Sequence, residues 1–155
     1  MPRRIKYNIG DLILIPIAGR EDKLVGRILA KDEATVLIEV FTMEPIMAVS
    51  EFDYEKVKLK KRLVTEWCYD SAIKRGEWGI ISNELEPLTN YGGINYWTLD
   101  ANGKFYLVKG TDKVDGEYTG IEISREEVSN CNPYGIGSVT SLPIYISKLL
   151  EKRKK

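Results

Sequence analysis

Residues that could carry out chemistry are scarce in this sequence, and histidine is absent. Histidine is the commonest general base, the usual partner of a serine or cysteine nucleophile, and a common transition-metal ligand. Carboxylates and lysines can replace it, but the expectation of catalysis falls. We therefore predict no catalytic residue and no enzymatic activity.

Potential metal and cofactor ligands also lack a productive spacing. Glu51, Asp53 and Glu55 would share one face of a strand, but a hard-cation loop needs more converging oxygens than this pattern supplies. Cys68 and Cys131 are the two cysteines, and their separation matches no metal-ligand motif. The glycines form no phosphate-binding motif. We predict no metal and no cofactor.

Aromatic residues concentrate in the middle of the chain. About half of them should enter a core, and the rest are suited to anchor a protein interface. Tyr91, Tyr96 and Trp97 lie in or beside a glycine-rich loop, and Glu84 and Glu86 precede that loop. These five residues are our candidates for partner binding. Glu84 and Glu86 could also form a glycosidase pair, but nothing in the sequence distinguishes their environments.

The charges balance, since Lys plus Arg and Asp plus Glu both number 23. No net field therefore favours nucleic acid. The basic run from residue 54 to residue 62 is either a local nucleic-acid patch or an exposed edge strand guarded by lysines, and we favour the strand. No export signal and no apolar run of membrane-spanning length is present, so we expect a cytoplasmic protein with reduced cysteines and no membrane partner.

The opening of the chain predicts a meander of three strands over residues 11–17, 23–29 and 34–41, which are apolar and rich in β-branched residues. Gly26 lies within the second of these strands, a position that marks a bulge or a close backbone approach. The pattern is typical of a small curled antiparallel sheet or an SH3-like barrel core. In the strand predicted at residues 63–69, alternation places Val64, Glu66 and Cys68 on one face.

Shorter sequence signals predict the remaining helices, strands and turns. Asp70 and Gly76 fit the start and end of a short mid-chain helix, and Asn102-Gly103 predicts a hairpin between residues 94–99 and 104–108. We also expect strands at 78–81 and 120–123, a capping box at 124–127, a loop at 130–139 and a C-terminal helix from residue 141. The sequence thus predicts one α+β, mainly β domain over residues 1–155.

A set of short motifs recurs in a recognisable order and spacing. A Gly-Asp opens a strand that ends in an apolar-Pro, a Gly-Arg lies in the second strand, and an Asp-Ser turn is followed by a Gly-x-Trp. These positions are Gly10, Asp11, Pro16, Gly26, Arg27, Asp70, Ser71, Gly76 and Trp78. Their combination, over roughly the first 90 residues, resembles the immunity protein 26 family of bacterial polymorphic-toxin systems.

This resemblance implies a cytoplasmic immunity protein that neutralises a cognate toxin domain by tight binding, without catalysis. The recurring residues Gly10, Asp11, Gly26, Arg27, Asp70, Gly76 and Trp78 are best explained as structural, because partner specificity should lie in loops and exposed side chains. The resemblance identifies neither the toxin nor the oligomeric state.

Two other interpretations stay open. The opening strands and the basic run would suit a nucleic-acid-binding small β-barrel module. An endoribonuclease of the growth-inhibiting toxin type also begins with a Gly-Asp strand, but it would need an acid-base pair that is not evident here. Arg27 itself is either an anion ligand or, as we favour, the partner of a carboxylate such as Asp70.

Overall fold

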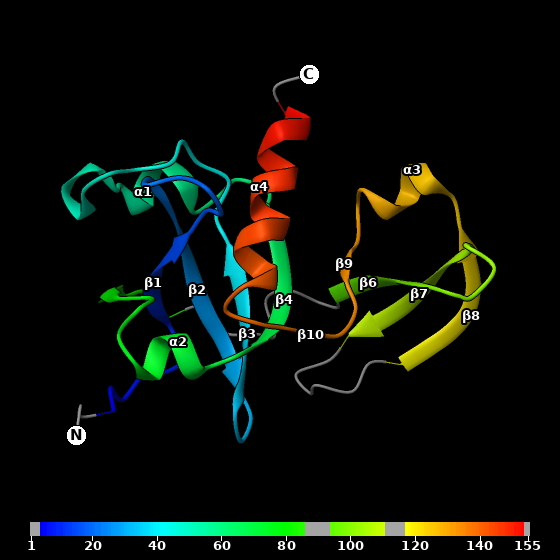
Figure 1. The fold of residues 1–155 in the computed structure, drawn as a ribbon, viewed down its shortest axis with the longest axis horizontal. Coiled ribbons are helices and arrows are strands. Elements are labelled where there is room, and N and C mark those ends of the chain that lie inside the picture. The colour runs from blue at the N-terminus through cyan, green and yellow to red at the C-terminus, as the bar shows by residue number, and fades with distance from the viewer. Residues whose placement is uncertain (1–3, 86–93, 111–116, 154–155) are drawn as a thin grey trace.

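The computed structural model describes residues 4–85, 94–110 and 117–153, and it contains two sheets that lie side by side (Figure 1). The first sheet runs in the order β10, β4, β3, β2, β1, β5, and the second in the order β8, β7, β6, β9. The first comprises β1 (Asp11–Pro16), β2 (Lys23–Lys31), β3 (Thr35–Val40), β4 (Val64–Tyr69), β5 (Ile80–Asn83) and β10 (Ile136–Gly137). The second comprises β6 (Ile94–Leu99), β7 (Phe105–Gly110), β8 (Glu117–Ile123) and β9 (Asn132–Pro133).

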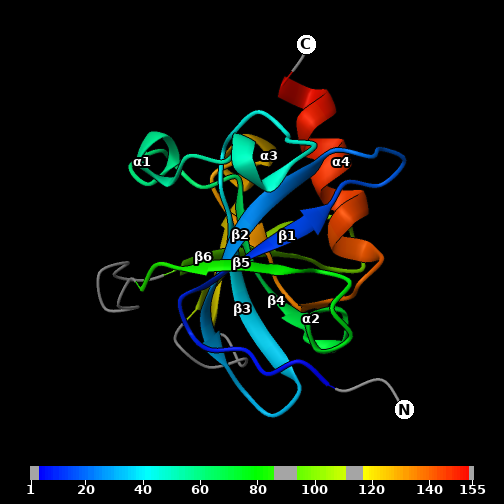
Figure 2. The ribbon, with the colours of Figure 1, turned by 90° about the vertical axis from the view of Figure 1, so that its left-hand side faces the viewer.

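Both faces of the first sheet are covered. On one face Ile13, Ile15 and Ile28 pack against the C-terminal helix α4 (Ser141–Arg153), and the short helix α2 (Ser71–Lys74) contributes to the same core. On the other face Leu12 and Val25 pack with the chain that includes η1 (Val49–Glu51) and α1 (Tyr54–Val57). Figure 2 shows α1 and α4 on opposite sides of β2. Strands β1, β2 and β3 are therefore largely buried and apolar on both sides, whereas the edge strand β5 is mostly exposed.

The second sheet is built on the predicted hairpin of β6 and β7. The Asp100 carboxylate accepts hydrogen bonds from the N–H groups of Asn102 and Lys104, which fixes the turn. Ile94 and Tyr96 pack against Leu37 and Trp67 of the first sheet, so the two sheets share an apolar contact. This contact sets where β6 stands relative to β4.

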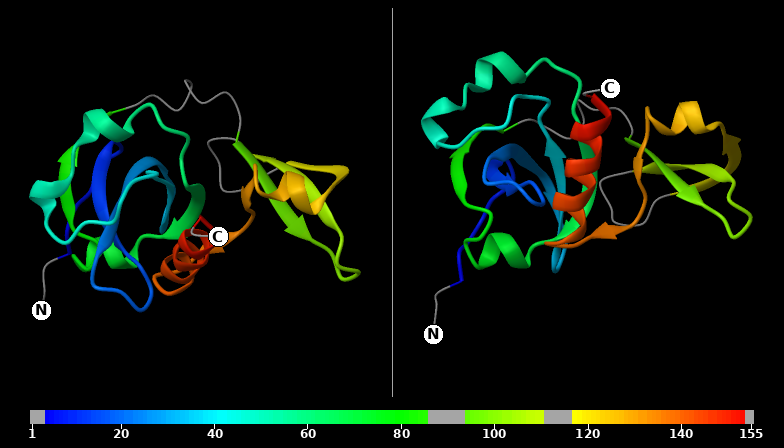
Figure 3. Two further views of the ribbon diagram at one scale, coloured as in Figure 1. Left: turned by 90° about the horizontal axis from the view of Figure 1, so that it is seen from above. Right: turned by 45° about the horizontal axis from the view of Figure 1, so that its top comes forward.

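One segment, from Asn132 to Gly137, joins the edges of both sheets. Its first part, β9, pairs in parallel with β6, and its second part, β10, pairs in parallel with β4. The Asn132 side chain reinforces the crossing, since it accepts from the Thr65 N–H at 2.6 Å and donates to the Asn95 carbonyl at 3.2 Å. Figure 3 shows this segment leading from the second sheet to α4.

The predicted α+β, mainly β fold is confirmed, with its short mid-chain helix and its C-terminal helix. Of the two core alternatives, the described strands form open sheets and no closed barrel. The capping box before α3 (Arg125–Val128) is present, because Ser124 Oγ accepts from the Glu127 N–H while Glu127 accepts from the Ser124 N–H. No helix in these described ranges has the length and apolar character needed to cross a membrane.

Two local predictions were wrong. Residues 54–62 form helix α1 and a turn, not an edge strand, because the Asp53 carboxylate accepts from the Glu55 N–H and starts a helix. Val57 is buried there, whereas Leu59, its supposed strand neighbour, is 91% exposed. The predicted loop at 130–139 contains β9 and β10, whose two-residue length gives no periodic signal.

Candidate functional site

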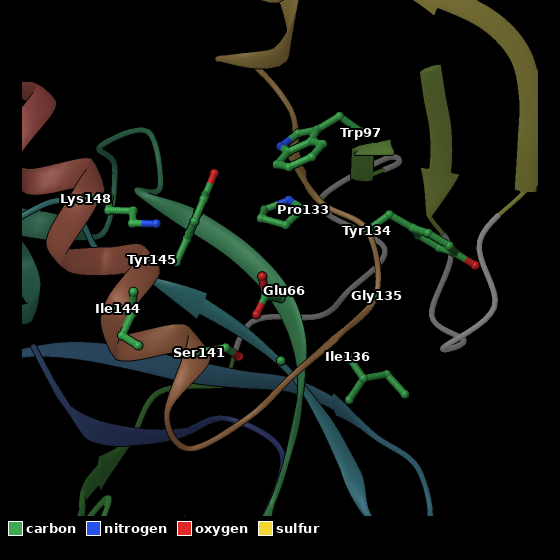
Figure 4. A pocket seen from close by; sticks show the side chains of 11 residues that line it. Glu66, Trp97, Pro133, Tyr134, Gly135, Ile136, Ser141, Ile144, Tyr145 and Lys148 are labelled. Atoms are coloured by element: carbon green, nitrogen blue, oxygen red, sulfur yellow. The ribbon is translucent and has the colours of Figure 1, made fainter. Parts of the chain in front are cut away.

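A cavity of about 400 Å³ opens where the Asn132–Gly137 segment crosses between the sheets (Figure 4). Its walls come from β4, β6, the crossing segment and one face of α4. The lining residues are Glu66, Trp97, residues 133–137, Ser141, Ile144, Tyr145 and Lys148. We call this space the inter-sheet cavity. It joins parts of the chain that are far apart in sequence, as binding sites commonly do.

Glu66 is the chemically distinctive group of the inter-sheet cavity. It is 7% exposed and lies on the face of β4 that also carries Val64 and Cys68. The residues that the structure describes give its carboxylate no hydrogen bond and no ion pair, and burial raises its pKa to about 7. A carboxylate that is mostly kept from water and has no counter-charge favours the protonated form, or a cation brought from outside.

Gly137 makes room for this carboxylate. A Cβ atom at residue 137 would overlap Glu66 Oε1, so a larger residue could not occupy this position without moving Glu66. The parallel pairing of Gly137 with Cys68 brings the two chains into this register. The pairing of β10 with β4 thus places the backbone of residue 137 directly beside the acid.

Aromatic rings form much of the remaining wall. Trp97 is half-buried and makes an edge-on contact with Phe105, with ring centroids 5.7 Å apart. Tyr145 lies half-buried on α4, where burial raises the pKa of its hydroxyl. Tyr134, 41% exposed, makes an edge-on contact with Tyr96 at 6.0 Å. In Figure 4, Trp97, Pro133 and Tyr145 stand around the space beside Glu66.

Helix α4 supplies its cavity residues through helical spacing. Ser141, Ile144, Tyr145 and Lys148 follow the i, i+3, i+4, i+7 pattern and line the cavity, while Leu142, Ile146 and Leu150 are buried on the adjacent face. The first turn is fixed from outside the helix, because Ser138 Oγ accepts from the Ser141 N–H at 3.0 Å. The helix therefore uses one stripe for the core and another for the cavity.

The predicted partner-binding residues are scattered. Trp97 lines the inter-sheet cavity, whereas Tyr96 is 2% exposed and packs between the sheets. Glu84 is half-buried, and its backbone carbonyl accepts from Arg27 Nη1 at 2.7 Å. Tyr91 and Glu86 lie outside the described residues. The structure therefore brings Trp97, but neither Tyr96 nor Glu84, to the cavity.

Arg27 forms an intramolecular ion pair, as favoured from the sequence, but its partner is Glu39 and not Asp70. The two residues are opposite each other on β2 and β3, with Nε and Oε1 2.9 Å apart, and both side chains are buried. Arg27 Nη1 also donates to the Tyr54 hydroxyl, and Arg62 Nε lies 3.0 Å from Glu39 Oε2. Asp70 instead accepts from the Tyr7 hydroxyl and pairs with Lys74.

The other family-pattern residues occupy structural positions. Gly10 has φ +94°, which favours glycine, and Asp11 accepts from the Asn83 side chain and so ties β1 to β5. A Cβ at Gly26 would lie 2.9 Å from the Glu39 carbonyl oxygen, so the strands approach closely there. Gly76 ends α2 with φ +79°, and Trp78 is buried in the core. Asp70 precedes α2 but makes no side-chain cap.

Sequence reasoning missed Glu66, Tyr134 and Tyr145. For Glu66 a signal was available, because strand alternation already placed this carboxylate on the same face as two apolar residues. Tyr134 and Tyr145 gave no comparable signal, since their role depends on the Asn132–Gly137 crossing. Within the described ranges, no group of three or more cysteine, aspartate or glutamate side chains could hold a metal ion.

A known protein family matches a large part of the chain. The profile described as Immunity protein 26 matches residues 8–106, and no curated protein and no solved structure shows a significant match. This match covers more than half of the chain and defines it as an immunity protein, directed against a toxin. The chain belongs to the immunity protein 26 family. The predicted resemblance is confirmed, and the matched region includes Glu66 and Trp97 but ends before residues 133–148.

Proposed function

We propose that this protein binds a cognate toxin domain in the cytoplasm and neutralises it by occupying its surface, without catalysis. The observation that carries the proposal is the family match over residues 8–106. The lack of histidine supports a binding role, because the commonest general base and nucleophile partner is missing. Binding alone would then have to supply the protection.

The rim of the inter-sheet cavity is the surface that we assign to the toxin. Tyr134, Ile136 and Ile144 line it and are 41%, 41% and 42% exposed. Adjacent apolar side chains that water reaches are typical of a surface that another protein covers. A recess surrounded by such residues also suits an interface in which a few anchors supply most of the binding energy.

The rest of the molecule supports a preformed surface. The buried side chains of Arg27 and Glu39 pair across β2 and β3, and the half-buried Arg62 joins them. Strand β4 packs through Val64 and Cys68 on one face and through Trp67 on the other. A rigid surface loses less entropy on binding than a surface that must order itself. Tight inhibition would therefore not require refolding of the immunity protein.

Coexpression in a bacterial host tests the proposal directly. The protein is produced together with each protein encoded beside its gene, and growth is measured while the neighbour is induced. We expect protection from one toxic neighbour and coelution of the two purified proteins on size exclusion. Growth arrest by toxic neighbours without any protection would contradict the proposal.

A matched pair of variants tests the assigned surface. Ile136→Asp places a charge on the cavity rim and should abolish protection and coelution. Ile121→Asp makes the same change at a 53% exposed isoleucine on β8, away from the cavity, and should keep both. Equal loss of protection in the two variants, or full protection by Ile136→Asp, would show that the toxin binds elsewhere on the protein.

A further inference from the structure

The carboxylate of Glu66 is a charge site without a counter-charge in the described structure. It is 7% exposed, borders a cavity of about 400 Å³, and neither donates to nor accepts from any described residue. A buried ionised carboxylate is costly unless a cation or hydrogen-bond donors compensate it. The cavity leaves space for such a group beside the acid (Figure 4).

The groups around Glu66 restrict the kind of ligand that the cavity could bind. Helix α4 contributes the Tyr145 ring and, at the exposed mouth, the Lys148 ammonium, which makes no ion pair with Glu66. Tyr96 from β6 and Cys68 from β4 feel the charge of Glu66, and burial, the larger cause, raises the pKa of both. Lys148 is therefore the one cation among these lining groups, and it does not neutralise the acid.

The aromatic wall selects among cations. Planar, weakly hydrated guanidinium stacks on aromatic faces and offers paired N–H donors to both oxygens of a carboxylate. Ammonium is more strongly hydrated and lacks the planar fork. Trp97 and Tyr145 provide rings beside Glu66, and Trp is the best cation–π surface among side chains.

We propose that the inter-sheet cavity receives an arginine side chain of the toxin, with its guanidinium paired to the Glu66 carboxylate against the rings of Trp97 and Tyr145. This inference rests on the proposed function, since it takes the toxin as the source of the arginine. The apolar rim then surrounds a buried charge pair, an arrangement typical of interface hot spots. The arginine supplies the counter-charge that the described chain lacks.

The chemistry of the cavity can be measured without the toxin. The probe is N-acetyl-arginine amide, added to the full chain while the Trp97 indole N–H is followed by NMR. We expect saturable shifts at about millimolar concentrations, as the ligand size allows. N-acetyl-citrulline amide, which has nearly the same shape without the charge, should give none. Equal shifts with both probes, or none with either, would overturn the proposal.

Two variants and the pH dependence test whether Glu66 causes the arginine-dependent shifts. Glu66→Gln should abolish the arginine-dependent shifts, whereas Glu122→Gln, at an exposed residue on β8, should keep them. Burial raises the pKa of Glu66 to about 7, so the probe should bind about tenfold more weakly at pH 6 than at pH 8. Binding that strengthens on acidification, or survives in Glu66→Gln, would contradict a cation pair.

The toxin assay separates the two proposals. If the wild-type protein protects cells and Glu66→Gln fails to do so, the arginine site is supported. If both protect equally, the site is wrong but the proposed function stands. If the wild-type protein protects against no toxic neighbour, the proposed function fails, and the probe experiment still decides whether the cavity binds guanidinium.

Discussion

Gly137 and Glu66 are matched in space: the missing side chain of one residue leaves the volume that the carboxylate of the other occupies. The two residues come from strands β10 and β4, which pair in parallel although they lie far apart along the chain. The environment of the acid is thus determined by a backbone that arrives from the other sheet. Substitution at residue 137 should therefore act on the titration of residue 66.

Gly137→Ala should lower the pKa of Glu66 below about 7. The added methyl group pushes the end of the flexible side chain towards the open cavity, where water stabilises its charged form. Titration of the carbon-13 carboxyl signal of Glu66 measures this shift. Gly79→Ala is the control, because a Cβ there would meet no heavy atom within 4 Å. An unchanged Glu66 midpoint in Gly137→Ala would argue against the steric match.

Glu66 should make stability fall with rising pH. Its pKa rises from the ordinary 4.5 to about 7 on folding, so between these values the folded state holds a proton that the unfolded state has lost. The free energy of unfolding should decrease by about 3 kcal/mol from pH 4 to pH 8 through this group and level off above its folded pKa.

Glu66→Gln should remove that dependence. We expect it to be less stable than the wild type by about 1 kcal/mol at pH 4, because the amide has unmet hydrogen bonds, and more stable by about 2 kcal/mol at pH 8, where the wild type has lost about 3 kcal/mol through Glu66. Urea denaturation at the two pH values measures both differences, and Glu122→Gln should follow the wild type. A wild-type advantage at pH 8 would show that Glu66 has a stabilising partner.

Arg27→Met should destabilise the protein by about 3 kcal/mol or more, because it removes a buried cation that pairs with the buried Glu39 carboxylate. The double variant Arg27→Met, Glu39→Met should recover part of the loss, since it removes both charges. Arg75→Met is the control, because its pair with Glu77 is exposed and should contribute little. Similar unfolding midpoints for Arg27→Met and Arg75→Met would refute the structural role of the buried pair.

Unfolding of the wild type tests whether residues 1–155 form the single domain predicted from the sequence, and we expect one cooperative transition. Asn132→Ala tests the link between the two sheets, because it deprives the Thr65 N–H of its acceptor and should lower the free energy of unfolding by about 1–3 kcal/mol. Hydrogen exchange at the Thr65 N–H should be faster in this variant. The control is Asn130→Ala, because the Asn130 side chain is exposed and accepts only from Lys61 among the described residues. It should change neither the free energy of unfolding nor the exchange rate at Thr65. Two separate wild-type transitions would show that the sheets are independent units.

Short-range signals predicted much of the fold. The Asn102-Gly103 turn, the Ser124 capping box and the first three strands each depend on residues close in sequence, and each is present. Helix α1 was missed because the alternation of Val57 and Leu59 mimicked a strand, whereas the local cap at Asp53 determined the outcome.

The cavity could not be predicted in the same way. Its walls depend on the pairing of β10 with β4 and of β9 with β6, and strands of two residues carry no periodicity. The ion pair of Arg27 was expected, but the identity of Glu39 followed from the register of β2 and β3, which single-strand patterns do not specify.

The residues that line the inter-sheet cavity differ in how strongly the fold restricts their substitution. Glu66 lies on β4, which has a paired strand on each side. Tyr134 lines the cavity from the Asn132–Gly137 segment, and Ile144 and Lys148 line it from the cavity-facing side of α4. Exchanges at these three positions alter the shape and charge of the recess and leave the central strands untouched. If the cavity binds a toxin as proposed, substitutions in the final quarter of the chain can change which toxin it fits, while Glu66 and the central strands stay the same.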